Sequence, residues 1–290
     1  MKVYINGKFY NKDDAKISIF DHGLLYGDGV FEGIRSYDGL VFKLEKHIDR
    51  LYNSAKMIRL NIHMTRAQLI KEVIRTLKKN KLKNAYIRLA VTRGPGDLGL
   101  DPRKCKRGII FIISDKIKLY PQKFYEKGLS IITAKTKRNL PQALNPRIKS
   151  LNYLNNILAK IDAIDAGTEE AIMLTYDGYV AECTGDNIFM VKKNKLITPP
   201  TEIGALEGIT RDTVIGIARK NKIKFCEKKI KLPELYRADE CFLTGTAAEI
   251  IPVVMIDKKK IGTAKPGSVT KLLTEEFRKQ TRKTGVRYSI

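Results

Sequence analysis

Apolar side chains recur every three or four residues in several stretches of the chain, a spacing that predicts amphipathic helices. The clearest stripe leads to Gly167, which is placed to stop a helix, and consists of Leu151, Leu154, Leu158, Ile161 and Ile164. We expect this stripe to face a core. Further helices are predicted over residues 43–59, 65–80, 209–221 and 268–284.

Short β-prone runs bounded by turn residues predict the strands. The pairs Asn6-Gly7, Asp38-Gly39 and Asp177-Gly178 are typical of hairpin turns. Strands are expected over residues 2–10, 16–20, 85–92, 108–114, 171–175, 179–181, 196–198, 241–243 and 250–255.

Chain length limits the number of cores. A chain of 290 residues that is 43% apolar can bury one large core or two moderate ones, and two domains fit the usual size range. Pro121 and several polar residues interrupt the pattern after the strand at 108–114. We therefore expect a small N-terminal domain over residues 1–116, a connection over 117–128 and a larger C-terminal domain over 129–290.

The net charge of +24 raises the question of nucleic-acid binding. The lysines are spread along the chain with acids between them, and the sequence has no basic arm, no tryptophan and no recognised nucleic-acid motif. We therefore expect no nucleic-acid partner. A lysine-rich surface would instead serve solubility or attract anionic substrates.

Membrane and metal partners are not expected either. No run approaches the roughly 18 apolar residues that a membrane span needs, and the first residues resemble a strand and turn more than a signal peptide. The four cysteines lie far apart without paired spacing, which favours free reduced thiols over a zinc site or disulfides. A cytoplasmic protein is the expectation.

Lys149 is the first candidate for chemistry. Pro146 prevents a helix just before it, so we expect its ammonium to project from a short extended segment ahead of the helix. A partly buried lysine can lose its proton and act as a nucleophile. Tyr153 follows close behind. A solvated lysine at a helix start is the alternative, so the rest of the sequence must decide.

Several residues in the first half suit a bound anion. Arg50 lies beside the apolar stripe of its predicted helix, where it could hold a phosphate or carboxylate or form a surface ion pair. Tyr86 and Arg88 share one face of a predicted strand and could bind a substrate carboxylate. The glycine-rich run from 21 to 35 lets backbone approach a ligand, and the irregular loop from 93 to 102 fits a binding loop or subunit contact.

The second half adds two backbone sites for anions. The predicted helix that begins at Ile209 has exposed N–H groups, a favourable dipole and the Thr210 hydroxyl, which together suit a phosphate. The turn from 244 to 249 is rich in small and hydroxyl residues and can offer further N–H groups. Glu182, at a predicted strand end beside a Thr-Gly turn, is placed to pair with a cation, although a solvated glutamate is the alternative.

One composite motif resembles a known family. The run Glu182-x-Thr184-x-x-Asn187-Ile188-Phe189, followed by Leu196-x-Thr198 and Leu206-x-Gly208-Ile209-x-Arg211, resembles the signature of the class IV aminotransferases, the fold-type IV pyridoxal phosphate enzymes. The resemblance covers nearly the whole chain and is strongest to the branched-chain amino acid aminotransferases. It implies an α+β or α/β fold of two domains, with a smaller N-terminal α/β domain, a larger β-rich C-terminal domain and pyridoxal 5'-phosphate between them.

The resemblance also implies roles for individual residues. Lys149 would hold the cofactor as a Schiff base and then carry the proton of the substrate Cα, Glu182 would pair with the pyridinium nitrogen, and Tyr153 would bind the ring oxygen. The phosphate would be held by Arg50, Ile209, Thr210 and Thr246. Thr246 and Ala247 would bind the substrate α-carboxylate.

The implied substrates are L-leucine, L-isoleucine, L-valine and glutamate or 2-oxoglutarate. Phe31, Gly33 and Tyr153 would line the pocket beside Tyr86, while Arg88 would accept the distal carboxylate of glutamate. Tyr26 and Leu100 would come from a neighbouring subunit of a homodimer or a multiple of dimers. One departure from the family is Cys183, where a small glycine is usual.

Two other activities on the same fold stay open, those of a D-amino acid aminotransferase and of an aminodeoxychorismate lyase. The D-enzymes typically have an Arg-x-His pair after the strand that contains Tyr86, and residues 93–103 contain no histidine. A catalytically silent or nucleic-acid-binding descendant would have lost Lys149 or its partners, and all of them are present. A branched-chain aminotransferase is therefore the preferred prediction.

Overall fold

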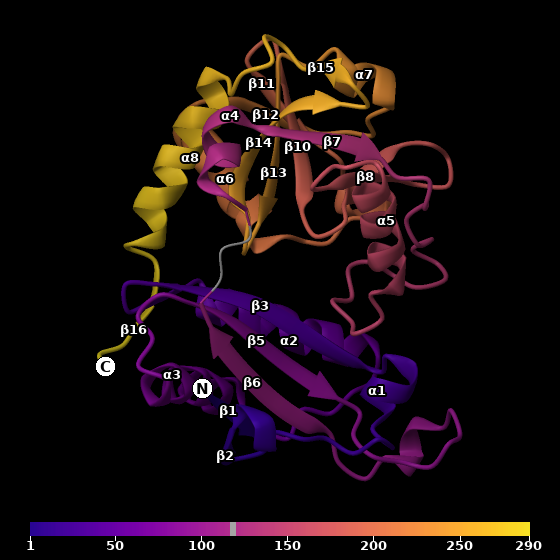
Figure 1. Ribbon diagram of the computed structural model, residues 1–290, viewed down its shortest axis with the longest axis vertical. Coiled ribbons are helices and arrows are strands. Elements are labelled where there is room, and N and C mark those ends of the chain that lie inside the picture. The colour runs from indigo at the N-terminus through magenta and orange to yellow at the C-terminus, as the bar shows by residue number, and fades with distance from the viewer. Residues whose placement is uncertain (117–119) are drawn as a thin grey trace. The chain divides into compact units, whose positions relative to one another are not determined.

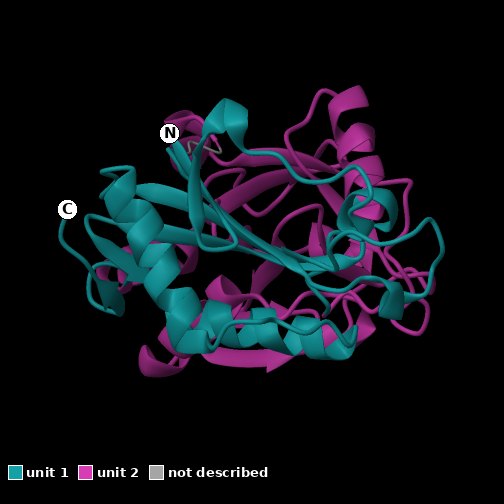
Figure 2. Ribbon diagram, turned by 90° about the horizontal axis from the view of Figure 1, so that it is seen from below, with its two compact units in different colours: residues 1–117, 148–153, 281–290 teal, residues 118–147, 154–280 magenta. Residues whose placement is uncertain are grey.

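Two sheets, each with its own helices, account for most of the computed structural model, which describes every residue except 117–119 (Figure 1). The chain divides into two units (Figure 2). Unit 1 comprises residues 1–117, 148–153 and 281–290, and unit 2 comprises residues 118–147 and 154–280. The predicted connection over 117–128 starts at residues 117–119, which lie outside the described residues; its later part contains helix α4.

Unit 1 contains a seven-stranded antiparallel sheet of the described residues, in the order β16-β4-β3-β5-β6-β1-β2. Its elements are β1 (Lys2–Ile5), β2 (Lys8–Asn11), α1 (His22–Tyr26), β3 (Gly29–Tyr37), β4 (Leu40–Phe42), α2 (Leu44–Met57), α3 (Arg66–Lys79), β5 (Ala85–Thr92), β6 (Ile109–Asp115) and β16 (Gly285–Arg287), with short 3-10 turns at Lys12–Asp14 and Pro102–Lys104.

The helices of unit 1 pack through the stripes that the sequence predicts. Helix α2 contacts β3, and α3 contacts β1, β5 and β6. Leu44, Ile48 and Leu51 of α2 are fully buried in the same cluster as Leu69 and Val73 of α3. The Thr65 hydroxyl accepts the Gln68 N–H while the Gln68 side chain accepts the Thr65 N–H, a capping box that sets where α3 begins.

The predicted strand over residues 16–20 is wrong, and no strand forms there. Phe20 lies in a turn, and Asp21 caps α1 by accepting the Gly23 N–H at 2.7 Å. The side chains of Ile19 and Phe20 are exposed. The apolar spacing was therefore misleading, because these residues lead into a helix cap instead of pairing with a strand.

Unit 2 contains a mixed sheet whose described strands follow the order β12-β11-β10-β13-β14-β7-β8-β9, with β15 paired to β14. Its elements are α4 (Gln122–Lys127), β7 (Leu129–Thr133), α5 (Leu154–Asp165), β8 (Ala171–Leu174), β9 (Val180–Cys183), β10 (Asn187–Lys192), β11 (Lys195–Thr198), a 3-10 turn (Thr201–Ile203), α6 (Ile209–Lys220), β12 (Lys224–Glu227), α7 (Leu232–Tyr236), β13 (Glu240–Gly245), β14 (Glu249–Ile256), β15 (Lys259–Lys260) and α8 (Ser268–Thr281).

Helix α5 is oriented differently from the sequence prediction. Leu154, Leu158, Ile161 and Ile164 are exposed instead of facing a core of this chain. The buried face consists of Asn156, Ala159 and Ala163, and the two alanines pack with Ala171 and Met173 of β8. The periodicity correctly indicated an apolar face, but small residues on the opposite face allow the close approach to the sheet.

Within the part of the chain that the structure describes, no helix combines the length and the apolar character needed to cross a membrane. The segment over residues 148–153 belongs to unit 1, where Ser150 forms an antiparallel bridge with Val30 of β3. The last residues return to unit 1 as well, where β16 pairs with β4. The predicted N-terminal domain, residues 1–116, does not include these two later segments of unit 1.

Candidate active site

Lys149 lies outside any helix, five residues before α5. Its backbone is held on both sides, because its carbonyl accepts the Phe31 N–H at 2.9 Å and its own N–H donates to Ser54 Oγ of α2 at 3.1 Å. The Nζ atom is 3.3 Å from the Tyr153 hydroxyl, to which it can donate a hydrogen bond. The nitrogen also lies 4.7 Å from the centroid of the Phe31 ring. An amine, a phenol and an aromatic wall therefore meet in unit 1.

The same aromatic wall has a second cation on it. The Arg88 guanidinium lies 4.3 Å from the Phe31 ring centroid, and the Phe31 and Tyr153 rings meet edge to face at 5.1 Å. Gly33 is opposite Arg88 in the ladder of β3 and β5. A Cβ atom on Gly33 would lie 2.0 Å from the Tyr86 hydroxyl, so glycine is needed for the phenol to occupy its position. The structure thus brings the predicted residues Phe31, Gly33, Tyr86, Arg88, Lys149 and Tyr153 together.

Arg50 projects from α2 into an ion pair with the buried Glu32, whereas the ion pair considered from the sequence was one at the surface. Its Nε and Nη2 atoms donate to the two oxygens of Glu32, each at 2.7 Å. His47 Nδ1 is also 2.7 Å from Glu32. Burial alone would raise the pKa of the Glu32 carboxyl, but the charges and hydrogen bonds of Arg50 and His47 outweigh it and lower the pKa to about 2. The side chain of Arg50 is therefore held in one orientation by a buried carboxylate.

Tyr26 and Leu100 lie elsewhere in unit 1. The Tyr26 hydroxyl donates to the Leu98 carbonyl at 2.5 Å, and its ring meets the His22 ring edge to face. Leu100 belongs to the glycine-rich loop, and its side chain is 80% exposed. The structure therefore groups Tyr26 with this loop, not with Lys149.

In unit 2, Glu182 lies in β9 with three polar partners. Arg138 Nη2 is 2.8 Å from Oε1, while Oε2 accepts from the Leu206 N–H at 2.9 Å and from Asn187 Nδ2 at 3.2 Å. Glu182 does pair with a cation, which in this structure is Arg138. Its pairing with a pyridinium nitrogen stays a prediction. A carboxylate has about four acceptor positions, so these contacts leave room for one more donor.

Asn187 connects Glu182 to the start of α6. Its Nδ2 atom also donates to the Leu206 carbonyl at 2.9 Å. A Cβ atom on Gly208 would lie 2.0 Å from Asn187 Oδ1, so only glycine fits at this position. Gly208 is the N-cap of α6 and provides no side-chain cap, which leaves the N–H groups of the first turn available for an anion. Ile209 and Thr210 are the first two residues of that turn.

Thr246 and Ala247 lie in the turn between β13 and β14. Thr244, just before the turn, is opposite Asn187 in the sheet. Its buried hydroxyl oxygen has no hydrogen-bond partner among the described residues. A Cβ atom on Gly245 would lie 1.8 Å from Asp186 Oδ1, so this turn packs closely against the residues between β9 and β10. The structure thus places the predicted turn beside the strand that carries Asn187.

Sequence reasoning missed Glu32, His47 and Arg138 as members of these clusters. A signal existed for Glu32, because a carboxylate in a run as apolar and glycine-rich as Val30 to Ile34 requires a buried cation. His47 and Arg50 are three residues apart and share a helix face, which could have suggested that cation. Arg138 gave no signal, since 44 residues separate it from Glu182 and no pattern surrounds it.

Comparison with known proteins identifies the family. Residues 29–256 match the family described as Amino-transferase class IV. The chain is 53% identical over 287 residues to the "Putative branched-chain-amino-acid aminotransferase" of Methanocaldococcus jannaschii, covering 99% of each chain. It is also 37% identical over 277 residues to the D-alanine aminotransferase of Bacillus licheniformis, covering 93% of this chain and 94% of that protein.

The fold is also that of solved enzymes. The branched-chain amino acid aminotransferase of Thermobaculum terrenum, solved in its pyridoxal phosphate form, superposes with a TM-score of 0.87 at 32% identity, over 97% of this chain and 93% of that one. The predicted two-domain α+β fold class is thereby confirmed. The motif that starts at Glu182 predicted the same family as the match over residues 29–256, and the chain therefore belongs to the class IV aminotransferases.

Proposed function

We propose that this chain is a branched-chain amino acid aminotransferase that uses pyridoxal 5'-phosphate. It would transfer the amino group between L-leucine, L-isoleucine or L-valine and 2-oxoglutarate. The observation that carries the proposal is the Lys149 amine held beside the Tyr153 hydroxyl and the Phe31 ring. The names and titles of the relatives and solved structures supply the substrate class and the cofactor.

Lys149 has the contacts that a covalent cofactor site requires. Its backbone is tied at both N–H and carbonyl, so the amine is presented from a fixed point. Lys149 Nζ would hold the cofactor and, once released by substrate, move the proton at the substrate Cα. When bound, pyridoxal phosphate supplies the electron sink that makes this Cα proton removable. The Tyr153 hydroxyl would bind the oxygen on the cofactor ring.

The residues of unit 2 fit the other groups of the same cofactor. Glu182 retains an acceptor position for a ring N–H, while Arg138 and Asn187 hold its carboxylate in place. The uncapped N–H groups of Ile209 and Thr210 suit a phosphate, and Gly208 gives the close backbone approach that such a site needs. Thr246 would add a donor to the phosphate, and the Thr246 and Ala247 backbone would bind the substrate α-carboxylate. Arg50, which Glu32 already orients, would add a positive charge beside the phosphate.

The walls around Lys149 suit the proposed substrates. The Phe31 and Tyr86 rings, packed closely over Gly33, would provide aromatic surface for an apolar substrate side chain. Arg88, on the Phe31 ring, would bind the distal carboxylate of glutamate or 2-oxoglutarate. One pocket would then accept both partners of the transamination.

We also propose that the protein works in the cytoplasm as a homodimer or a multiple of dimers. Support for the assembly comes from the exposed apolar face of α5, where Leu154 and Ile164 are each 61% exposed, and from exposed Leu98 and Leu100 in the glycine-rich loop. Tyr26 and Leu100 would extend to a neighbouring subunit. The four free cysteines agree with a reducing compartment.

Light scattering on a size-exclusion column tests the assembly. A dimer-based mass should fall toward that of one 32.9 kDa chain when Leu158→Glu and Ile161→Glu are combined. A monomeric natural protein, or an assembly indifferent to these changes, would contradict the proposed role of this face.

A D-amino acid aminotransferase is the second candidate, because the 37% identity to the D-alanine enzyme is no lower than the 32% identity to the solved Thermobaculum terrenum enzyme. The experiment that separates them follows the visible absorbance of the lysine-bound cofactor while single amino acids are added. Conversion to the pyridoxamine form by L-leucine, L-isoleucine, L-valine and L-glutamate, and not by D-alanine, is expected. Conversion by D-amino acids only would overturn the substrate assignment.

Lys149→Ala provides the matching variant, with Lys46→Ala on the exposed face of α2 as a control. The first should abolish the lysine-bound absorbance and activity, while the second should leave both unchanged. If natural protein purified with pyridoxal phosphate shows no such absorbance, the cofactor assignment is wrong.

A further inference from the structure

A cavity in unit 1 is lined by residues other than those of the Lys149 cluster. It is open to solvent and has a volume of about 620 Å³, within the usual range for small-molecule sites. Its walls come from the residues that follow α2 (59–63), from the first residue after β5 and from the segment 101–108 that leads into β6. None of the residues that the resemblance assigned to cofactor or substrate lines it.

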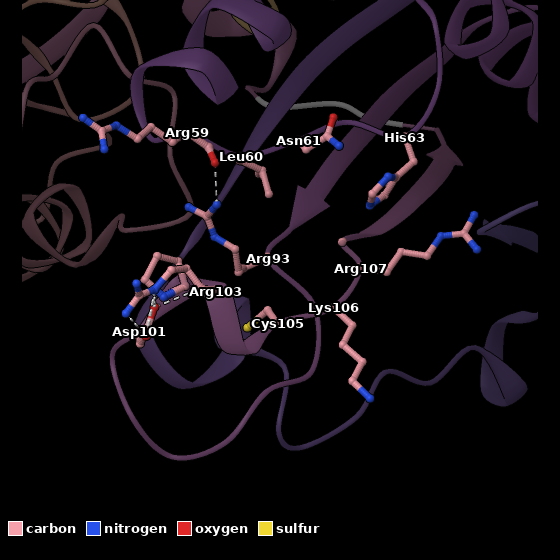
Figure 3. Close-up of a pocket in the computed structure, with 12 residues that line it drawn as sticks. Arg59, Leu60, Asn61, His63, Arg93, Asp101, Arg103, Cys105, Lys106 and Arg107 are labelled. Carbon is pink, nitrogen blue, oxygen red and sulfur yellow. Dashed lines mark hydrogen bonds and ion pairs between the residues drawn. The ribbon is translucent and has the colours of Figure 1, made fainter.

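The lining of this cavity is strongly cationic. Arg59, Arg93, Arg103, Lys106 and Arg107 contribute five cations, and Asp101 is the one carboxylate among the lining residues. In Figure 3, Arg93 lies in the middle, the Arg59 side chain extends to one side, and Lys106 and Arg107 extend to the other. Cations therefore lie on more than one side of the cavity.

Two of these cations are already neutralised by ion pairs. Arg93 donates to Asp28 at 2.8 and 3.0 Å and to the carbonyls of Arg59 and Ile58, each at 2.8 Å, so it fixes the wall. Arg103 pairs with Asp101, its Nη2 at 2.7 Å from Oδ2.

Three cations remain without such neutralisation. Among the described residues, the side chains of Arg59, Lys106 and Arg107 have no ion pair, and all three residues are exposed. Three like charges around one cavity repel one another unless an anion joins them. In Figure 3 their long side chains extend outward, and they would turn inward to contact a ligand.

The remaining lining group that could carry negative charge does not do so at neutral pH. Burial raises the pKa of the Cys105 thiol, and the nearby Asp28 carboxylate raises it further. Cys105 therefore stays a neutral thiol and does not offset the surrounding cations. His63 adds an imidazole ring to the same lining.

We propose that this cavity binds a small anion with two or more phosphate groups. A carboxylate presents two oxygens in one plane, which a single guanidinium can satisfy, whereas a phosphate presents three oxygens in different directions. Cations on opposite sides of the cavity, as Arg59 and Arg107 are in Figure 3, match the second geometry. The site is separate from the proposed phosphate site at the start of α6.

Isothermal titration of the full chain with inorganic pyrophosphate tests this proposal. The protein is first saturated with pyridoxal phosphate and freed of excess, so that the proposed cofactor site cannot take the probe. One molecule of pyrophosphate should bind per chain, with an affinity that falls as salt rises from about 0.05 to 0.2 M. Citrate, the polycarboxylate probe, should bind at least about fivefold more weakly.

The pocket variant combines Arg59→Asn with Arg107→Ser. Asparagine suits position 59, where φ is +52°, better than most residues do. The control combines Lys78→Ser with Lys79→Ser on the exposed end of α3, which removes the same charge from the same unit. The pocket variant should weaken pyrophosphate binding by about tenfold or more, and the control by less than about twofold.

Three results would overturn the proposal. They are no binding of pyrophosphate, equal losses in the pocket variant and its control, and citrate binding as tightly as pyrophosphate. Equal losses would mean that the overall charge of +24 attracts the anion without a defined site. The titration does not depend on aminotransferase activity, so it can fail or succeed independently of the function proposed above.

Discussion

Glu32 and Arg50 form a two-pronged ion pair in unit 1, with both nitrogen–oxygen distances at 2.7 Å and the carboxylate fully buried. The pair joins the middle of β3 to α2, the helix whose Ser54 also holds the Lys149 backbone. The buried Glu32 carboxylate thus orients Arg50, which is proposed to bind the cofactor phosphate. It also holds α2, the helix that supports the backbone of Lys149, the proposed nucleophile.

Glu32→Gln should therefore destabilise the protein strongly. Removing one partner of a buried pair leaves an uncompensated charge and costs about 3–5 kcal/mol. The control is Asp49→Asn, on the same helix as Arg50, which breaks an exposed ion pair with Arg66 of α3 and should cost less than about 1 kcal/mol. Urea unfolding at pH 7 measures both. Similar costs for the two variants would show that the buried pair contributes no more than the exposed one.

The contribution of Glu32 should also depend on pH. Its pKa is about 2 in the folded chain against a usual value of 4.5, so the folded state binds this proton less readily than the unfolded state. The stabilisation is then complete above about pH 4.5 and is lost as the pH falls toward 2. The stability difference between the natural protein and Glu32→Gln should shrink over this range, and a constant difference would contradict the assignment.

His47 should also make the protein less stable as the pH falls, in a pH range above that of Glu32. Burial lowers the pKa of its imidazole below the usual value of 6.5, although the Glu32 carboxylate beside it acts in the opposite direction. The unfolded chain then takes up this proton first, so stability declines as the pH falls below about 6.5. Unfolding at pH 7.5 and 5.5 should show the natural protein losing more stability than His47→Gln. If His47→Gln instead lost more stability than the natural protein, the pKa of His47 would be raised in the folded chain and not lowered.

Gly33→Ala tests the close approach of Tyr86. The new methyl group would lie 2.0 Å from the phenol oxygen, so the ring must move, and we expect a cost of about 1–3 kcal/mol together with reduced turnover of branched substrates. Gly216→Ala in α6 is the matched control, because its Cβ would meet no atom within 4 Å. It should stabilise the protein by about 0.4–1 kcal/mol. If Gly33→Ala keeps full stability and activity, the contact with Tyr86 does not shape the pocket.

Arg138→Lys tests how Glu182 is held. Arg138 donates to Asn156 Oδ1 at 2.9 Å and to the Gly204 carbonyl at 3.1 Å as well as to Glu182, a planar set that an ammonium cannot reproduce. We expect about tenfold weaker retention of pyridoxal phosphate, measured by absorbance after dialysis. The control is Arg147→Lys, whose pair with Glu207 is largely exposed and should be tolerated. Unchanged retention in Arg138→Lys would remove Arg138 from the proposed site.

Local sequence determined the elements and the family. Strand β5 has the predicted bounds, Ala85–Thr92, because apolar residues occupy every second position from Ala85 to Val91 and turn signals flank the strand. Helix α6 starts at Ile209 as predicted, directly after the N-cap Gly208, and the Glu182 motif identified the family. Each of these signals lies within a short window of the chain, where backbone preference and side-chain period act directly.

The tertiary structure alone decided which distant residues meet. The pairs Glu32–Arg50 and Arg138–Glu182 join different elements, and no local spacing encodes their contact. The orientation of α5 was also beyond the pattern, because periodicity identifies an apolar face but not what covers it. Likewise, residues 148–153 return to unit 1 through a bridge between Ser150 and Val30. Bringing residues together that are far apart in the sequence costs conformational entropy. Such pairs form only when many contacts of the fold form with them and offset this cost.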